Sequence, residues 1–157
     1  MPIIRDEAKR KEIIGLLTQA YWMELETVQN YIANSVNPEG VRAEEIKKSL
    51  AEDIADEIGH AQTFGRRIKE LYGRVPGSFD FKPEQKSLQP PADCTDLVSV
   101  IKGVIEAEQG AIDHYTKVIR ACEGVDYVTA DIVTKILGDE EGHLREFEGF
   151  LKEYEKK

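Results

Sequence analysis

Four segments of the chain carry an apolar stripe at helical spacing, and one glutamate interrupts each stripe near its middle. The apolar residues recur at alternating steps of three and four positions, which is the pattern of a helix face turned toward a bundle core. The interrupting residues are Glu24, Glu57, Glu108 and Glu140. A fold that buries these stripes must therefore bury four carboxylates as well.

The stripes are otherwise apolar, except that His143 accompanies the fourth glutamate. The first two segments contribute Leu17, Tyr21, Glu24, Val28 and Tyr31, and then Leu50, Ile54, Glu57, Ala61, Phe64, Ile68 and Leu71. The last two contribute Ile101, Ile105, Glu108, Ile112, Tyr115, Ile119 and Cys122, and then Val133, Ile136, Glu140, His143, Phe147, Phe150 and Tyr154. No lysine or arginine lies in any stripe.

Burying an ionised carboxylate without a partner costs more free energy than the net stability of a domain can offset. A single buried glutamate could be paired with a nearby arginine. Four of them, one per segment and all at mid-length, need a common partner that carries several positive charges. The pattern therefore predicts that a pair of divalent or trivalent cations neutralises the four glutamates.

Two of the glutamates belong to Glu-x-x-His motifs, Glu57 to His60 and Glu140 to His143. A spacing of three residues places the carboxylate and the imidazole on one helix face, where both can reach one metal ion. One copy of the motif is a weak signal. Two copies, accompanied by core glutamates in the other two segments, match the ligand set of di-iron and di-manganese carboxylate bundles. The predicted ligands are Glu24, Glu57, His60, Glu108, Glu140 and His143.

An internal repeat supports this ligand count. Glu24 precedes Tyr31 by seven residues, and Glu108 precedes Tyr115 by seven. Glu24 lies 33 residues before Glu57, while Glu108 lies 32 before Glu140. The two halves therefore resemble each other, as expected if two helical hairpins build one site about a pseudo-twofold axis.

Other polar residues fall off the stripes. Glu106 lies two positions from Glu108 and is expected to face outward, and the same reasoning excludes Glu26 as a ligand. His114 also falls off its stripe, so we expect an exposed histidine there.

The chain divides into four predicted helices, at about residues 4–35, 43–72, 95–121 and 127–154, separated by segments rich in turn residues. Short turns join the first helix to the second and the third to the fourth, so each pair should be antiparallel. The middle connection holds four of the six prolines and is about twenty residues long, enough to run the length of a bundle. We expect one all-α domain over residues 1–157, a four-helix bundle of two antiparallel hairpins joined by a long crossover, as in ferritin-like folds. Two separate hairpins joined by a linker are the alternative.

Composition narrows the classes of partner. The formal net charge is -9, from 30 acidic and 21 basic residues, which argues against nucleic acid as a partner and suits a protein that attracts cations. No apolar run is long enough for a membrane span and no targeting leader is recognisable, so a cytoplasmic location is expected. Cys94 and Cys122 form no Cys-x-x-Cys pair, so they supply neither a zinc ribbon nor a rubredoxin-type iron site, and we expect free thiols.

The mixture of ligands indicates the metal. Carboxylates together with imidazoles suit iron or manganese, whereas calcium and magnesium rarely recruit imidazole. Six ligands shared by two ions exceed what a tetrahedral structural zinc site needs. We predict two iron ions, with manganese as the alternative.

These motifs resemble the ferritin superfamily, most closely the bacterioferritins and the bacterioferritin-like members of the Dps-like group. The resemblance is carried by MELETVQNY around Glu24, ADEIGHAQ around Glu57 and His60, EAEQGAIDHY around Glu108, and GDEEGHLREFE around Glu140 and His143. It covers nearly the whole chain. It implies that Glu57 and Glu140 bridge two irons, that Glu24 and His60 are terminal ligands of one, and that Glu108 and His143 are terminal ligands of the other.

Three positions depart from the patterns within this family. Haem-binding bacterioferritins carry a methionine directly after the second-helix glutamate, where this chain has Ile58, so no haem is expected. The chain ends fourteen residues after His143, too soon for the fifth helix of 24-subunit cages, so a homo-oligomer is expected as a dimer or a twelve-subunit shell. Some archaeal relatives place a cysteine pair beside the metals, and Gly110 stands at the corresponding third-helix position.

The resemblance predicts a ferroxidase, in which two Fe(II) ions are oxidised by O2 or H2O2 and the product is stored as mineral if a shell forms. A rubrerythrin-like di-iron oxidase or peroxidase without mineral storage is the alternative. A non-enzymatic helical interaction module with a structural polar seam is a third hypothesis, which the four buried glutamates disfavour.

The residues beside the ligands carry two further expectations. Asp56 and Asp139 directly precede the two motif glutamates, and each is predicted to hydrogen-bond the outer nitrogen of a ligand histidine from the opposite hairpin, with a plain surface role as the alternative. Tyr31 and Tyr115 are expected to pack in the core near the metals.

Overall fold

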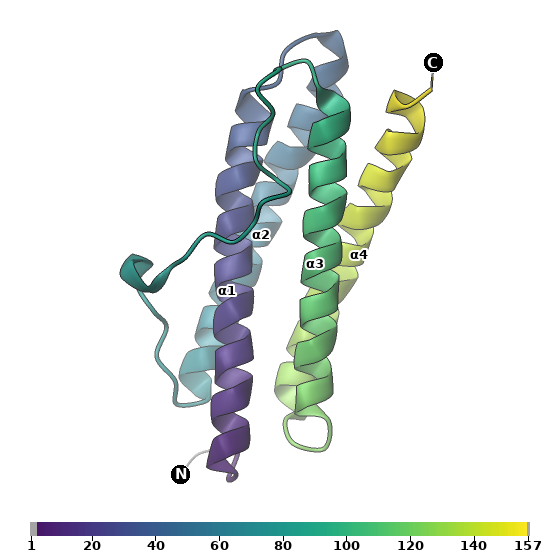
Figure 1. Ribbon diagram of the computed structural model, residues 1–157. Helices are drawn as coiled ribbons and strands as arrows, with labels where there is room; N and C mark the ends of the chain where they lie inside the picture. The colour runs from purple at the N-terminus through teal and green to yellow at the C-terminus, as the bar shows by residue number, and fades with distance from the viewer. Residues whose placement is uncertain (1–2, 157) are drawn as a thin grey trace.

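Four long helices make up the structure, a computed structural model that describes residues 3–156 (Figure 1). The helices are α1 (Glu7–Val36), α2 (Glu44–Glu70), α3 (Leu97–Cys122) and α4 (Tyr127–Tyr154). Two short 3-10 turns, η1 (Val41–Ala43) and η2 (Ser78–Asp80), lie between them. The predicted all-α fold of two hairpins and a crossover is confirmed, although η2 adds a helical turn where none was expected.

Aspartate caps set three of the helix starts. The side chain of Asp6 accepts a hydrogen bond from the backbone N–H of Lys9 at 3.1 Å, which satisfies a donor that the helix itself leaves free. The helix α1 therefore begins at Glu7 rather than near residue 4. Asp96 and Asp126 cap α3 and α4 in the same way. The helix α2 ends two residues before the predicted position, because Tyr72 adopts a positive φ of 67° that a helix cannot continue.

The helices pack as two antiparallel pairs, α1 with α2 and α3 with α4, and the pairs meet mainly along α1 and α3. Buried apolar side chains form two clusters along the bundle. One contains Leu17, Phe64, Tyr115 and Val133, and the other contains Tyr31, Leu50, Ile101 and Phe147. On every helix the stripe glutamate lies in sequence between a member of one cluster and a member of the other. The carboxylates are therefore enclosed between two dry layers of the core.

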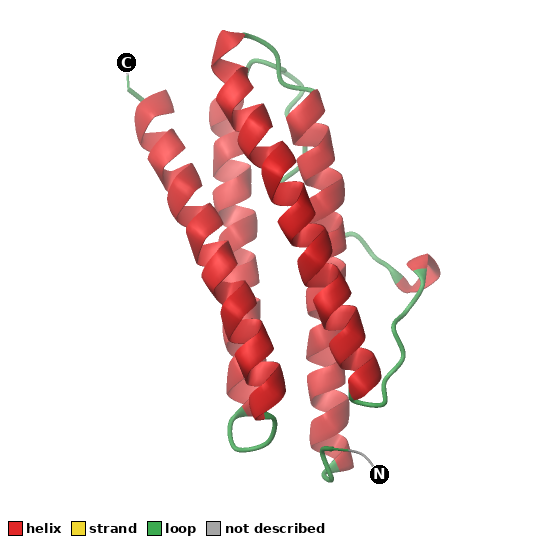
Figure 2. Ribbon diagram, turned by 180° about the vertical axis from the view of Figure 1, so that it is seen from behind, coloured by secondary structure: helices red, strands yellow, loops and turns green. Residues whose placement is uncertain are grey.

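The crossover between α2 and α3 runs along the α1–α3 side of the bundle (Figure 1). In the view from behind, α2 and α4 lie in front of it (Figure 2). Leu88 is its buried anchor, at 1% exposed, and the Leu88 carbonyl accepts a hydrogen bond of 2.9 Å from the Asn34 amide. Glu26 accepts hydrogen bonds of 2.8 Å from the backbone N–H groups of Glu84 and Gln85. Glu26 lies off the glutamate stripe as predicted, yet it is buried, because the crossover covers it.

The two cysteines are free, with Cys122 buried in the core and Cys94 partly exposed on the crossover. Within residues 3–156, no helix combines the length and the apolar character that crossing a membrane requires.

Candidate metal centre

The six predicted ligands meet at the middle of the bundle, with α1 and α3 each supplying one glutamate and α2 and α4 each supplying a Glu-x-x-His pair. All six side chains are buried, and the four glutamates are at most 2% exposed. Their stripes bring them together because each helix turns one narrow face to the bundle axis. The structure thus assembles every residue of the predicted set, while their action as ligands stays a prediction.

The ligand atoms fall into two overlapping groups, within each of which all atoms lie inside 4.8 Å of one another. One group is Glu24, Glu57, His60 and Glu140. The other is Glu57, Glu108, Glu140 and His143. Glu57 and Glu140 belong to both groups, which is the arrangement that two bridging carboxylates between a pair of ions would have.

Each histidine turns Nδ1 toward the carboxylates. Nδ1 of His60 lies 2.8 Å from Oε1 of Glu140 and 3.5 Å from Oε1 of Glu24. Nδ1 of His143 lies 3.1 Å from Oε1 of Glu57 and 3.7 Å from Oε1 of Glu108. Each imidazole is therefore nearest to the shared glutamate of the opposite hairpin, and the two halves of the site are related crosswise.

Several of these atoms lack a well-aligned hydrogen bond. Within residues 3–156, one carboxylate oxygen of each glutamate and Nδ1 of each histidine are buried without a partner of acceptable geometry. The 2.8 Å approach of His60 to Glu140 is a short contact between charged groups rather than an aligned hydrogen bond. Orphaned polar atoms are rare in protein interiors, and six in one place fit a site that offers its lone pairs to metal ions.

The pKa values of the two histidines are strongly raised. Burial opposes this shift, but the carboxylates of Glu140, Glu24 and Glu57 outweigh it and raise the pKa of His60. Burial likewise opposes the shift at His143, where Glu108, Glu140 and Glu57 raise the pKa. Without metal, these raised pKa values favour the doubly protonated form of both imidazoles.

The glutamates divide into two kinds. Burial, reinforced by neighbouring carboxylates, raises the pKa of Glu24 and of Glu108 well above the usual value. Burial acts in the same direction on Glu57 and Glu140, but the close contacts with Glu24, Glu108 and the two histidines outweigh it and lower both pKa values. With no metal bound, these directions favour the protonated form of Glu24 and Glu108 and the ionised form of Glu57 and Glu140. Two divalent ions would balance the charge of four ionised glutamates beside neutral histidines.

The outer nitrogens of the histidines face aspartates of the opposite hairpin, and the predicted hydrogen bond forms at His60 but not at His143. Nε2 of His60 lies 2.9 Å from Oδ2 of Asp139, within hydrogen-bonding distance. Nε2 of His143 is farther from its partner, 3.4 Å from Oδ2 of Asp56, and also lies 3.5 Å from Oδ1 of Asp53. Asp53 was not anticipated. Burial of the Asp53 side chain raises its pKa to about 7. Asp53 lies two turns before His60 on the same helix, and no sequence motif marks that position.

The two stripe tyrosines do more than fill the core. Both are fully buried, and Tyr115 donates a hydrogen bond to Oε1 of Glu24, while Tyr31 donates one to Oε1 of Glu108. Each tyrosine thus binds the glutamate of the other hairpin that belongs to a single ligand group. The seven-residue register of tyrosine and glutamate, which repeats in α1 and α3, is the sequence signal behind this crossed pairing.

The expectation that His114 is exposed is wrong. His114 is only 8% exposed, and its Nε2 lies 2.9 Å from the carbonyl oxygen of Leu16. It is covered because α1 packs against the flank of α3 as well as against its stripe, and burial lowers its pKa. Glu106, by contrast, is exposed as predicted.

Comparison with known families agrees with this geometry. The family profile described as Ferritin-like domain matches residues 14–157, most of the chain. The chain belongs to the ferritin family. Its buried glutamate and histidine cluster is of the kind typical of di-iron carboxylate sites in this family.

Two characterised proteins are distantly similar to this ferritin-like chain. It is 26% identical over 143 residues to the bacterioferritin of Desulfovibrio desulfuricans, covering 90% of this chain and 75% of that protein. It is 26% identical over 149 residues to the DNA protection during starvation protein of Pyrococcus furiosus, covering 90% and 77%. The predicted resemblance to bacterioferritins and Dps-like proteins is thereby confirmed.

Solved structures support the fold. A dodecameric thioferritin, the bacterioferritin-related protein of Bacteroides fragilis, superposes with a TM-score of 0.79 at 26% identity, covering 92% of this chain and 87% of that one. A ferritin-like di-iron carboxylate protein of Bacillus anthracis superposes with a TM-score of 0.77 at 23% identity, covering 91% and 97%. The similarity to the Bacillus anthracis protein shows only that the fold is shared.

Proposed function

We propose that this ferritin-like protein is a ferroxidase, which oxidises Fe(II) with O2 or H2O2 at a two-iron site inside each subunit. The observation that carries the proposal is the pair of overlapping ligand groups that share Glu57 and Glu140. Iron is the metal proposed because carboxylate and imidazole donors together suit iron and manganese, and because bacterioferritin is among the relatives. The biological role would be iron storage or detoxification.

Each ligand has a distinct place in this proposal. Glu57 and Glu140 would bridge the two ions, because each belongs to both groups. Glu24 and His60 would complete the shell of one ion, and Glu108 and His143 would complete that of the other. Two bound Fe(II) ions would together supply two electrons to the oxidant.

The surrounding side chains would orient the ligands and exclude water. Asp139 accepts the N–H of His60 at its outer nitrogen, which leaves Nδ1 free to bind metal. Tyr115 and Tyr31 hold the terminal glutamates by their Oε1 atoms. The two apolar clusters enclose the site on both sides along the bundle and limit the access of water to the oxidised product.

The test is anaerobic reconstitution of the purified protein with Fe(II), followed by air exposure while absorbance is recorded. We expect two irons per chain and rapid oxidation, both lost in Glu57→Ala and in Glu140→Ala. Glu141→Ala is the matched control, because Glu141 is the exposed neighbour of Glu140 on the same helix. A wild-type protein that binds only traces of iron, or variants that behave like the control, would refute the proposal.

Storage is a separate part of the proposal. The relative from Bacteroides fragilis is described as dodecameric, and a shell of twelve subunits is the assembly proposed for this chain. Light scattering of the purified protein and electron microscopy after iron loading test it together. A dimer without a mineral core would favour the alternative function, a rubrerythrin-like oxidase or peroxidase that does not store iron.

A further inference from the structure

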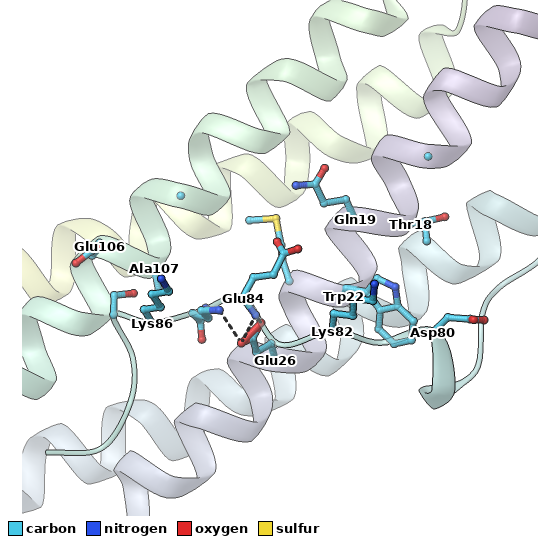
Figure 3. Close-up of a pocket in the computed structure, with 15 residues that line it drawn as sticks. Thr18, Gln19, Trp22, Glu26, Asp80, Lys82, Glu84, Lys86, Glu106 and Ala107 are labelled. Carbon is cyan, nitrogen blue, oxygen red and sulfur yellow. Dashed lines mark hydrogen bonds between the residues drawn. The ribbon is translucent and has the colours of Figure 1, made fainter. Parts of the chain in front are cut away.

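A cavity of about 620 Å³ lies between α1 and α3, beneath the crossover (Figure 3). We call it the crossover cavity. Its walls come from α1, from residues 80–87 of the crossover and from α3. Sites for small organic molecules have volumes of roughly 300 to 1,000 Å³, so the cavity is large enough for such a ligand. The ligand set of the metal centre lies outside its walls.

The inner wall of the crossover cavity separates it from the metal centre by one layer of side chains. Met23, Gln85 and Ala107 line the cavity and also line a second space of about 10 Å³. That inner space is bounded on its other side by all four stripe glutamates, so it touches the metal centre directly. A space of 10 Å³ has room for about one water molecule. A larger ligand would therefore stay in the outer cavity, beside the metals but not on them.

Two helix glycines line this cavity. Gly15 lines it from α1 and Gly110 lines it from α3, and a Cβ added at either would meet no atom within 4 Å. Glycine inside a helix costs about 0.5 to 1 kcal/mol relative to alanine. No close approach of backbone calls for glycine at either position, so a larger residue can be placed there to reduce the open volume.

The side chains of the cavity suit a planar aromatic guest. Trp22, the only tryptophan of the chain, lines it and is braced by Phe81 and Tyr21, with ring centroids 5.0 and 5.1 Å away. The thioether of Met23 and the methyl group of Ala107 add polarisable and apolar surface. Aromatic rings stack favourably on such walls.

Hydrogen-bonding groups in the same cavity are available to a ligand. Among residues 3–156, no partner is recorded for the indole N–H of Trp22 or for the amide of Gln19, and Figure 3 shows Gln19 directed into the space between α1 and α3. The hydroxyl of Thr18 donates to the carbonyl of Ile14 at 2.8 Å and keeps its capacity to accept. A guest that both donates and accepts hydrogen bonds would find partners here.

Carboxylates outnumber lysines around the cavity. Lys82 and Lys86 contribute two positive charges against the four carboxylates of Glu26, Asp80, Glu84 and Glu106. The carboxylate of Glu26 also accepts hydrogen bonds from backbone N–H groups of the crossover. This excess of negative charge repels an anionic guest, so the site favours one without negative charge.

We propose that the crossover cavity binds a neutral planar aromatic molecule that carries hydroxyl groups, of the phenol or hydroquinone class, against Trp22. The ring lies against the indole and Met23, and the hydroxyl exchanges hydrogen bonds with the free polar groups of the cavity. This proposal does not rest on the ferroxidase function, because the cavity is formed by the protein alone and its occupation is measured without metal.

The test uses the metal-free, fully assembled protein titrated with hydroquinone and 4-methylphenol. Fluorescence of Trp22, excited beyond the absorption band of the phenols, reports contact, and equilibrium dialysis gives the stoichiometry. Benzoate, which is planar but anionic, and cyclohexanol, which has a hydroxyl but no aromatic ring, are the comparison ligands. We expect saturable binding of about one phenol per chain and at least tenfold weaker binding of both comparison ligands.

Gly110→Leu and Gly15→Leu add a side chain to opposite walls of the cavity, at positions where a Cβ meets no atom within 4 Å, and both should weaken phenol binding at least tenfold. Gly149→Leu is the matched control, since Gly149 is an exposed glycine of α4 with equally open surroundings, and it should bind as the wild type does. Circular dichroism checks that each variant is folded. No saturable response to either phenol, or unchanged binding in both cavity-filling variants, would overturn the proposal.

Discussion

Nε2 of His60 on α2 lies 2.9 Å from Oδ2 of Asp139 on α4, so a residue of one hairpin orients a predicted ligand of the other. Asp139 is itself more than half exposed, with a side chain 57% accessible to solvent. Its place directly before Glu140 lets one helix present two carboxylates to the same imidazole, Glu140 at Nδ1 and Asp139 at Nε2. Metal binding at His60 therefore depends on the docking of the two hairpins.

Asp139→Ala is expected to lower metal affinity by about 10- to 100-fold, because His60 loses the group that fixes its ring and tautomer. Competition with a chelator for Mn(II), which is stable in air, measures the affinity. Asp131→Ala is the control, since Asp131 is an exposed residue of α4 that forms an ion pair with Lys135. An affinity loss no greater than that of the control would show that the contact does not orient the ligand.

Metal binding is expected to release protons. The pKa values of His60, His143, Glu24 and Glu108 are all raised, which favours proton binding at these groups in the metal-free protein, and metal binding displaces those protons. Rising pH removes the same protons, so the apparent metal affinity should rise with pH.

Titration of unbuffered metal-free protein with Mn(II) in a pH-stat counts the released protons directly. Binding without proton release, or an affinity that does not change with pH, would mean that protons do not occupy the metal-free site as its raised pKa values indicate. The Glu141→Ala variant should release as many protons as the wild type, because Glu141 is exposed and lies outside both ligand groups.

The fold and the six residues of the site could be predicted because both signals are local in sequence. Helical periodicity identifies which face of each segment is buried, and a glutamate on that face is conspicuous because its burial is so costly. The Glu-x-x-His spacing then adds His60, which lies off the apolar stripe. Asp139 could be predicted for the same reason, since it precedes a ligand directly.

The surroundings that depend on packing between distant segments could not be predicted. Glu26 is buried because the crossover, nearly sixty residues later, places backbone N–H groups over it. His114 is buried because the flank of α3 meets Leu16 on α1. The residue spacing within one helix does not predict either contact. The path of the crossover could not be predicted because this proline-rich segment has no helical or strand periodicity.

Tyr115→Phe is expected to destabilise the metal-free protein by about 1 to 3 kcal/mol, because the buried Glu24 carboxyl loses its hydrogen-bond donor. Denaturant unfolding at fixed subunit concentration measures the change. Tyr21→Phe is the control, since no hydrogen bond of the Tyr21 hydroxyl is recorded among residues 3–156, and it should change stability by less than about 0.5 kcal/mol. Equal effects of the two substitutions would show that the hydrogen bond from Tyr115 to Glu24 does not stabilise the protein.

Two glycine substitutions are expected to change stability in opposite directions. A Cβ on Gly103 of α3 would lie 2.4 Å from the carbonyl oxygen of Ser87. Because a backbone atom cannot move aside easily, Gly103→Ala should displace the crossover and lower the free energy of unfolding by about 1 to 3 kcal/mol. Gly149→Ala meets no atom within 4 Å and should instead gain up to about 1 kcal/mol from helix propensity. Denaturant unfolding measures both, and limited proteolysis should cut the crossover faster in Gly103→Ala alone. A stabilising Gly103→Ala would show that the crossover does not rest against α3 at this point.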